Sequence, residues 1–177
     1  MKTYSLPRQL LAELDAVLAL KPDRRHSPLE AVANLLYEGR HYFWIGIYLR
    51  VEERLERQAF RGPEAPCHSF ALNQGNVGTT GLRGVTKVVP DVSTDSTYSA
   101  CFRETRSELV VPIKLSTRVL GVIDIESDQL NAFGREDRVL IETVAKRLAR
   151  FLAWRGHYLL WRARRVKETP SVQSANA

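Results

Sequence analysis

SELVVPIKLSTRVLGVIDI, residues 107–125, contains two β-type runs, 107–113 and 119–125, on either side of the turn-like triplet 116–118. Both runs are rich in valine, leucine and isoleucine, which pack well on a pleated sheet, and the residues between them are polar. We therefore predict an antiparallel β-hairpin at the centre of the fold.

Further strand patterns precede this hairpin. The other predicted strands are an aromatic and β-branched run at 42–49, its hairpin partner at 55–61, and two short strands at 68–72 and 85–89. Pro90 breaks the last of them, because proline cannot donate to a strand ladder. The polar loop 91–106 that follows is long enough to suggest a function, such as a lid over a binding site.

Helical spacing of apolar residues marks both ends of the chain. The predicted helices cover residues 10–18, 28–37, 75–82 and 135–155. The second begins with SPLE, residues 27–30, which offers a hydroxyl N-cap, a proline at the first helical position and a glutamate three residues after the cap. Gly84 should end the third helix, and Gly156 is expected to kink or interrupt the fourth. Terminal helices around an antiparallel sheet predict an α+β fold with a pocket under its long connections.

The net charge of +6 is concentrated near the end of the chain. Eight of the 26 basic residues and no acidic residue lie between Glu142 and Glu168, and the rest of the chain carries 18 basic against 20 acidic residues. A basic helix bearing Trp154 and Trp161 can contact nucleic acid or an anionic membrane. Basic runs usually mark a solvated face, so we favour a solvated or dimer-forming terminal helix over those contacts.

A chain of 177 residues is expected to form one globular domain. We assign residues 1–26 to an N-terminal helix, 27–155 to the main domain and 156–177 to a basic helical extension that ends, from Glu168, in a disordered tail. The start of the chain lacks the apolar run of a secretion signal, and no stretch approaches about 18 apolar residues. We therefore expect a cytoplasmic protein.

The chain has two cysteines, Cys67 and Cys101, and both lie in loop-like sequence. In the cytoplasm such cysteines are more often free thiols than a structural bridge. They can cycle between dithiol and disulfide only if the fold brings them together.

Four motifs follow one another along the chain: WIGIYL at 44–49, VPDV at 89–92, SELVVP at 107–112 and GVIDIES at 121–127. As a set they resemble the successive motifs of a GAF domain, over about residues 27–152. The resemblance implies a six-stranded antiparallel sheet with the N- and C-terminal helices on one face and a small-ligand pocket under loops on the other.

Among GAF domains, the chain is most similar to the free methionine-(R)-sulfoxide reductases. That resemblance implies that Cys101 is the nucleophile and Cys67 the resolving cysteine. It also implies substrate-binding carboxylates and aromatic pocket residues, which here match Glu108, Asp124, Glu126, Trp44 and Tyr48. The implied reaction uses no cofactor, and the implied partner is thioredoxin, which reopens the disulfide.

The matching carboxylates also have a chemical rationale of their own. Asp124 and Glu126 are two residues apart on a predicted strand, so they point to the same face. Burying them among the apolar residues of that strand is costly, which favours a wet or ligand-filled cavity that could bind the ammonium group of a free amino acid. Clustered carboxylates raise the pKa of at least one member, and Glu108 is our candidate for the acid that protonates the sulfoxide oxygen.

Other candidate residues have simpler explanations. Trp44 and Tyr48 lie on an apolar strand, so core packing is an alternative for at least one of them. The four histidines are too scattered for a metal site, and the glycine-rich stretch 75–78 lacks the lysine of a phosphate loop. We expect neither a metal nor a cofactor.

The chain departs from the reductase pattern in two places. Val77 stands where many reductases carry a third cysteine, and CFRETRSE at 101–108 replaces the usual CDAASNSE and resembles a signalling GAF domain. Catalysis is therefore one of three hypotheses. The second is a non-catalytic GAF sensor or binding module for a small metabolite. The third is an interaction protein whose basic terminal helix pairs with another copy as a homodimer, or with a membrane or nucleic acid.

Overall fold

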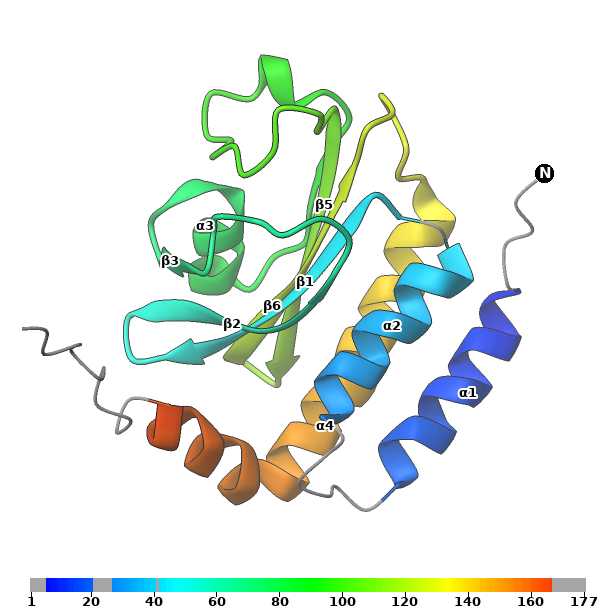
Figure 1. The fold of residues 1–177 in the computed structure, drawn as a ribbon, viewed down its shortest axis with the longest axis vertical. Coiled ribbons are helices and arrows are strands. Elements are labelled where there is room, and N and C mark those ends of the chain that lie inside the picture. Colours follow the sequence, from blue (N-terminus) through cyan, green and yellow to red (C-terminus); the bar gives the residue numbers. More distant parts are fainter. Residues whose placement is uncertain (1–5, 21–26, 41, 167–177) are drawn as a thin grey trace, which may run out of the picture.

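The computed structural model describes residues 6–20, 27–40 and 42–166. They form a six-stranded antiparallel sheet in the order β3-β2-β1-β6-β5-β4 (Figure 1). The strands are β1 (Trp44–Val51), β2 (Arg54–Arg61), β3 (Ser69–Ala71), β4 (Lys87–Val89), β5 (Ser107–Leu115) and β6 (Arg118–Ser127). Strands β5 and β6 are the predicted central hairpin, and β1 and β2 are the predicted hairpin before it.

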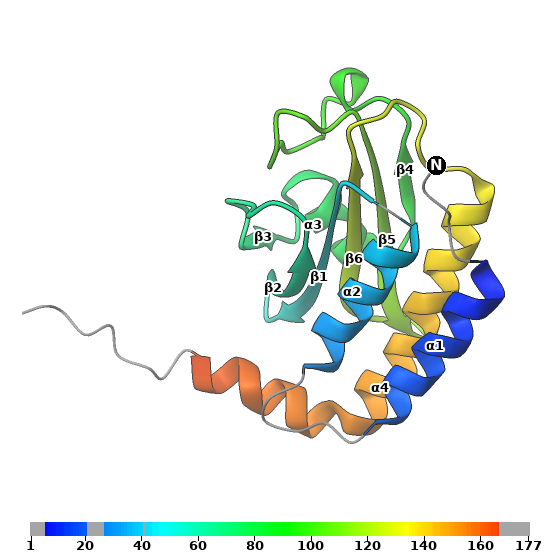
Figure 2. The same ribbon diagram turned by 45° about the vertical axis from the view of Figure 1, so that its right-hand side comes forward.

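Helices form a layer on one face of the sheet. This layer consists of α1 (Pro7–Ala19), α2 (Pro28–Arg40) and α4 (Arg135–Val166), with α1 packed on the other two (Figures 1 and 2). The short helix α3 (Gly75–Arg83) and the long loops cover the opposite face, and the loop after β4 contains a 3-10 turn, η1 (Val92–Thr94). The predicted α+β fold is confirmed.

The hydropathy of the helices bears on whether any of them could span a membrane. Within the part of the chain that the structure describes, none is long and apolar enough to cross a membrane.

Alternate residues of the three central strands face the two layers. Odd-numbered side chains pack with α1, α2 and α4 in the main core, and they include Ile45, Ile47, Leu109, Val111, Ile113, Ile123 and Ile125. Even-numbered side chains of the same strands face α3 and the loops in a second apolar cluster, and they include Trp44, Tyr48, Val110 and Val122. Strand side chains alternate in direction, so a buried strand that serves two layers needs apolar residues on both faces.

Local signals located most of the helix ends. The N–H of Glu30 donates to Ser27 Oγ at 3.5 Å, as the capping pattern predicts. Gly84 adopts a left-handed conformation with φ of 66° and ends α3. Helix α4 is continuous through Gly156, so the predicted interruption is wrong, because a single interior glycine costs a helix only about 1 kcal/mol. The helix does change direction toward its C-terminal end (Figure 2), and the predicted tail from Glu168 lies outside the described residues.

Helix α3 approaches the end of β3 very closely. A Cβ atom on Gly78 would lie 2.0 Å from the carbonyl oxygen of Ala71, so only glycine permits this contact. The approach holds α3 over β5 and β6, and with it two buried residues, Asn76 and Val77.

Candidate active site

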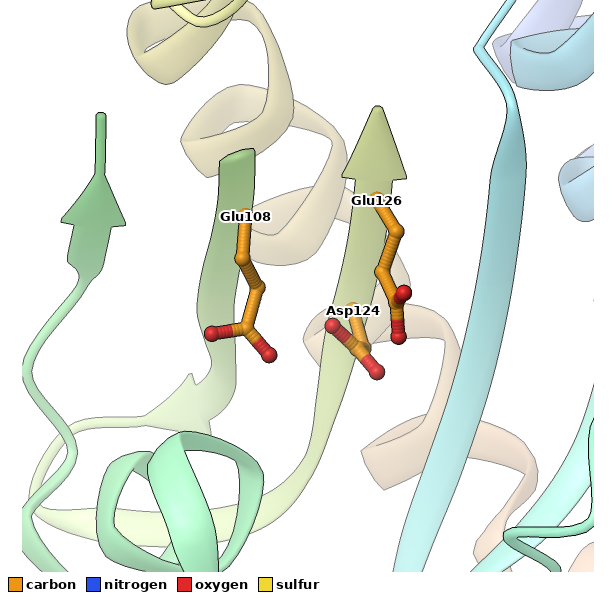
Figure 3. A group of neighbouring side chains, drawn as sticks. All are labelled: Glu108, Asp124 and Glu126. Atoms are coloured by element: carbon orange, nitrogen blue, oxygen red, sulfur yellow. The ribbon is translucent and has the colours of Figure 1, made fainter. Parts of the chain in front are cut away.

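Three carboxylates converge on the face of the sheet that α3 and the loops cover. Glu108 comes from β5, and Asp124 and Glu126 come from β6 (Figure 3). Glu108 and Glu126 are direct cross-strand partners. One carboxylate oxygen from each residue lies within 4.8 Å of the others, and all three side chains are at most 2% exposed. We call Glu108, Asp124 and Glu126 the carboxylate trio.

The members of the trio differ in their hydrogen bonds. Glu108 Oε2 accepts from Asn76 Nδ2 at 2.6 Å, and Glu126 accepts from the hydroxyl of Thr105. Neither oxygen of Asp124 has a hydrogen-bond partner among the described residues. A buried carboxylate without a partner is costly, so the trio requires either bound protons or a cation. An ammonium group or a metal ion placed here would meet three carboxylate oxygens.

The two aromatic residues predicted for the pocket are both buried beside the trio. Trp44 pairs across β1 and β6 with Glu126. Its indole is 1% exposed, and Nε1 has no hydrogen-bond partner among the described residues. Tyr48 is fully buried and donates its hydroxyl to the carbonyl oxygen of Cys67 at 3.0 Å. Both rings therefore pack in the second cluster, and the Tyr48 hydroxyl holds a loop; contact of either with a ligand stays a prediction.

The fold brings the two cysteines together. Cys67 lies in the loop between β2 and β3, and Cys101 in the loop after η1. They form a disulfide with their Cα atoms 5.8 Å apart, although 34 positions separate them in the sequence. The expectation that two such cysteines are free thiols therefore does not hold in this structure. Both are half-buried and pack against the second cluster, on the side of the sheet that carries the trio.

A model of the GAF domain family matches residues 19–152, well over half of the chain. The chain belongs to the GAF domain family. Its antiparallel sheet, with helices on one face and loops on the other, is the architecture that the GAF resemblance of its motifs implies.

This GAF domain is similar both to another GAF domain-containing protein and to reductases. GAF domain-containing protein A of Dictyostelium discoideum is 31% identical over 140 residues, 78% of this chain and 87% of that protein. Free methionine-R-sulfoxide reductase of Saccharomyces cerevisiae is 36% identical over 107 residues, 58% of this chain and 59% of that protein. The X-ray structure of free methionine-R-sulfoxide reductase from Neisseria meningitidis, in complex with its substrate, superposes with a TM-score of 0.78 at 30% identity, covering 86% of this chain and 96% of that one.

Burial raises the pKa of every member of the trio, and repulsion between the carboxylates adds to it at Glu108 and Asp124. Burial is the main cause at Glu108, where it raises the pKa to about 8, and at Glu126, where it raises the pKa to about 7. The pKa of Asp124 lies well above its usual range, first because of burial and then because of the charges of Glu108 and Glu126. This GAF domain therefore keeps carboxylic acids that can give up a proton near neutral pH.

The raised pKa values predict an unusual dependence of stability on pH. Between about pH 5 and 8 the folded trio keeps protons that the unfolded chain releases, so the free energy of unfolding should fall by about 2 kcal/mol or more as pH rises through this range. Denaturant unfolding of the oxidised, ligand-free protein measures this, because disulfide-bonded cysteines do not titrate. Asp95 does not contribute, since its pKa is lowered and it titrates below this range.

Asp124→Asn provides the comparison for the pH profile. The substitution removes the trio carboxylate whose oxygens have no hydrogen-bond partner among the described residues, and it keeps the shape of the side chain, so the profile should flatten and the protein should be more stable at pH 8. A wild-type profile that is level from pH 5 to 8 would show that the trio is not protonated in this range.

Sequence reasoning missed the residue that connects the trio to a charged network. Asn76 on α3 donates to Glu108, and its Oδ1 accepts from Lys87 Nζ at 2.6 Å and from Thr97 Oγ1 at 2.8 Å. Lys87 also forms an ion pair with Asp95 at 2.7 Å. The one local signal was a polar side chain on the buried face of a short glycine-rich helix. Asn76 orients the Glu108 carboxylate and leaves the other carboxylate oxygen, Oε1, as the atom able to carry a proton.

Proposed function

We propose that this GAF domain reduces free methionine-(R)-sulfoxide, with Cys101 as the nucleophile and Cys67 as the resolving cysteine. One observation carries the proposal: the two cysteines meet on the sheet face that bears three buried carboxylates. The similarity to reductases from Saccharomyces cerevisiae and Neisseria meningitidis supports it.

The trio suits the groups of a free amino-acid sulfoxide. The substrate carries an ammonium group, and Asp124 and Glu126 offer carboxylate oxygens to it. A bound cation offsets the cost of the buried negative charge, so substrate and site stabilise each other. Trp44 offers apolar surface to the methyl and methylene groups, and its Nε1 is a donor with no other partner among the described residues.

The first step transfers oxygen from the substrate to Cys101. The Cys101 thiolate attacks the sulfoxide sulfur while Glu108 protonates the sulfoxide oxygen, which makes the sulfur a better electrophile. Methionine leaves, its sulfur reduced by two electrons, and Cys101 is oxidised by two electrons to a sulfenic acid that keeps the oxygen. The proton that the Cys101 thiol lost to solvent replaces the one that Glu108 gave.

The second step regenerates a form that a reductant can act on. The Cys67 thiol attacks the sulfur of the sulfenic acid, water leaves, and the disulfide forms. The separation of 5.8 Å between the Cα atoms lies within the range that a disulfide needs. A dithiol protein then supplies two electrons and two protons, and thioredoxin is the expected donor in the cytoplasm, where we expect the chain to act.

Turnover of free L-methionine-(R)-sulfoxide with thioredoxin, thioredoxin reductase and NADPH tests the proposal. We expect repeated turnover by the wild type and none of the (S) epimer. Cys67→Ser should release about one methionine per chain at the wild-type rate and then become slow, because its sulfenic acid lacks a resolving partner. A wild type that is folded and reduced but inactive would exclude the reductase.

The alternative is a GAF binding module for a small metabolite that performs no chemistry. Phe102 favours it, because its ring lies 5.5 Å from the ring of Phe43 and 5.7 Å from that of Trp44 and so occupies the edge of the site. An inactive protein that binds methionine or its sulfoxide at equilibrium would support this alternative. A homodimer through the terminal helices stays a prediction, which sedimentation of the full chain can test.

A further inference from the structure

Arg57 on β2 forms several polar contacts with the loop that carries Cys67. Arg57 Nη2 forms an ion pair with Glu64 at 2.6 Å and contacts His68 Nδ1 at 2.8 Å, and Nη1 donates to the carbonyl oxygen of Ala65 at 3.0 Å. The backbone N–H of Arg57 donates to the carbonyl oxygen of His68 at 2.9 Å. Contacts from one residue therefore reach the chain on both sides of Cys67.

This set of contacts depends on the guanidinium group of Arg57. Arg57 only donates, so Nδ1 of His68 is the acceptor in this contact. The guanidinium also lies 4.3 Å from the centre of the Phe60 ring, and the side chain is 7% exposed. A planar fork that stacks and donates in several directions is a property of arginine that lysine does not share.

A residue on the neighbouring strand β1 contacts the same loop. The hydroxyl of Tyr48 on β1 donates to the carbonyl oxygen of Cys67 itself at 3.0 Å. With Arg57 holding the two flanks, the backbone of residues 64–68 is fixed to β1 and β2 next to the cysteine.

We propose that Arg57 is a positioning residue that holds the Cys67 loop where its thiol can close on Cys101. In doing so it sets the equilibrium between the dithiol and the disulfide and the rate of the resolving step. The inference rests on the proposed function for the resolving step, and the redox equilibrium can be measured without it.

The physical reason is the entropy of closing a bond between two loops. In the resolving step the Cys67 thiol attacks the Cys101 sulfenic acid, a sulfur–sulfur bond forms, and water leaves. If the Cys67 loop is already ordered in the reduced protein, less conformational freedom is lost when the bond forms. Releasing the loop therefore lowers the effective concentration of one thiol at the other and disfavours the disulfide.

Equilibration of the full chain with defined ratios of reduced and oxidised glutathione tests the inference. We expect Arg57→Met, which keeps an unbranched stem and removes the guanidinium donors, to lower the equilibrium constant for disulfide formation by about tenfold, a shift of ~30 mV toward a less negative reduction potential. Arg61→Met is the matched control, because Arg61 lies on the same strand and bonds Asn34 instead of the loop. Its potential should equal that of the wild type.

Kinetics separate the resolving step from the chemistry at Cys101. In a single turnover, release of methionine by Arg57→Met should keep the wild-type rate, while disulfide formation after it should slow by about tenfold. Arg57→Lys should shift the potential in the same direction by less, since it restores one donor and the charge; it is the variant to use if Arg57→Met does not fold.

The outcomes distinguish this inference from the proposed function. A folded Arg57→Met or Arg57→Lys with the wild-type potential would overturn the role of Arg57, whatever the activity of the protein. If the Arg57 variants have a shifted reduction potential and the wild-type protein does not reduce the sulfoxide, the role of Arg57 in holding the Cys67 loop would be supported and the reductase function refuted.

Discussion

Replacement of Cys101 by serine should lower the turnover of free methionine-(R)-sulfoxide by about 10⁴-fold or more. A serine hydroxyl is a far weaker nucleophile than a thiolate at neutral pH, and an oxygen atom cannot accept the sulfoxide oxygen as sulfur does. The variant should not release even the first methionine, whereas a variant of the resolving cysteine should. To measure this first release directly, the reduced enzyme is mixed with a stoichiometric amount of substrate, and the reaction is stopped by rapid quenching.

Cys67→Ser is the matched control for Cys101→Ser. Both variants lose the same disulfide, so any effect of the missing cross-link on the fold is common to them. A structural effect would reduce the first release of methionine in both, whereas the proposed chemistry reduces it only in Cys101→Ser. If Cys101→Ser released its first methionine at more than a few per cent of the wild-type rate, Cys101 would not be the nucleophile.

Glu108→Gln should lower kcat by about 10²- to 10⁴-fold, the usual contribution of a positioned general acid. The glutamine side chain keeps the shape of the glutamate, and its amide oxygen can still accept from Asn76 Nδ2. It has no proton to give to the sulfoxide oxygen. The same variant should be more stable than the wild type at pH 8, because a buried charge is removed, so activity and stability should change in opposite directions.

Steady-state kinetics and urea unfolding of the same preparations test this prediction. Glu104→Gln is the control, since Glu104 is an exposed carboxylate in the loop that carries Cys101, and both its kcat and its stability should match those of the wild type. A Glu108→Gln variant with a raised KM and an unchanged kcat would mean that Glu108 only binds substrate. Another member of the trio would then be the proton donor.

The sequence was sufficient for the parts of the structure that short-range patterns encode. Alternation along residues 121–127 placed Asp124 and Glu126 on one face, and the motif SPLE at 27–30 located the start of α2. Gly84 ended α3 as predicted, because its left-handed conformation is a local requirement of a helix end. These features depend on residues that are neighbours in the chain.

The remaining features depend on residues that are distant in the chain. The disulfide was implied by the family resemblance and not by any local pattern, because it requires that the loops around residues 67 and 101 meet in the fold. Asn76 gains its role from Glu108, 32 residues away, and from Lys87 on an edge strand. At Gly156, where the sequence predicts a kink or an interruption, the helix is not interrupted, because a single interior glycine costs a long helix only about 1 kcal/mol.

The alternation of side chains along β1, β5 and β6 has a consequence for how such a chain can evolve. Odd-numbered positions such as Ile45, Val111 and Ile123 pack against the helices, whereas even-numbered positions such as Trp44, Glu108 and Asp124 face the site. Selection for a folded domain and selection for a particular ligand therefore act on different residues of the same strands. Point changes at the positions that face the site can therefore alter which molecule is bound while the packing of the helical layer stays the same.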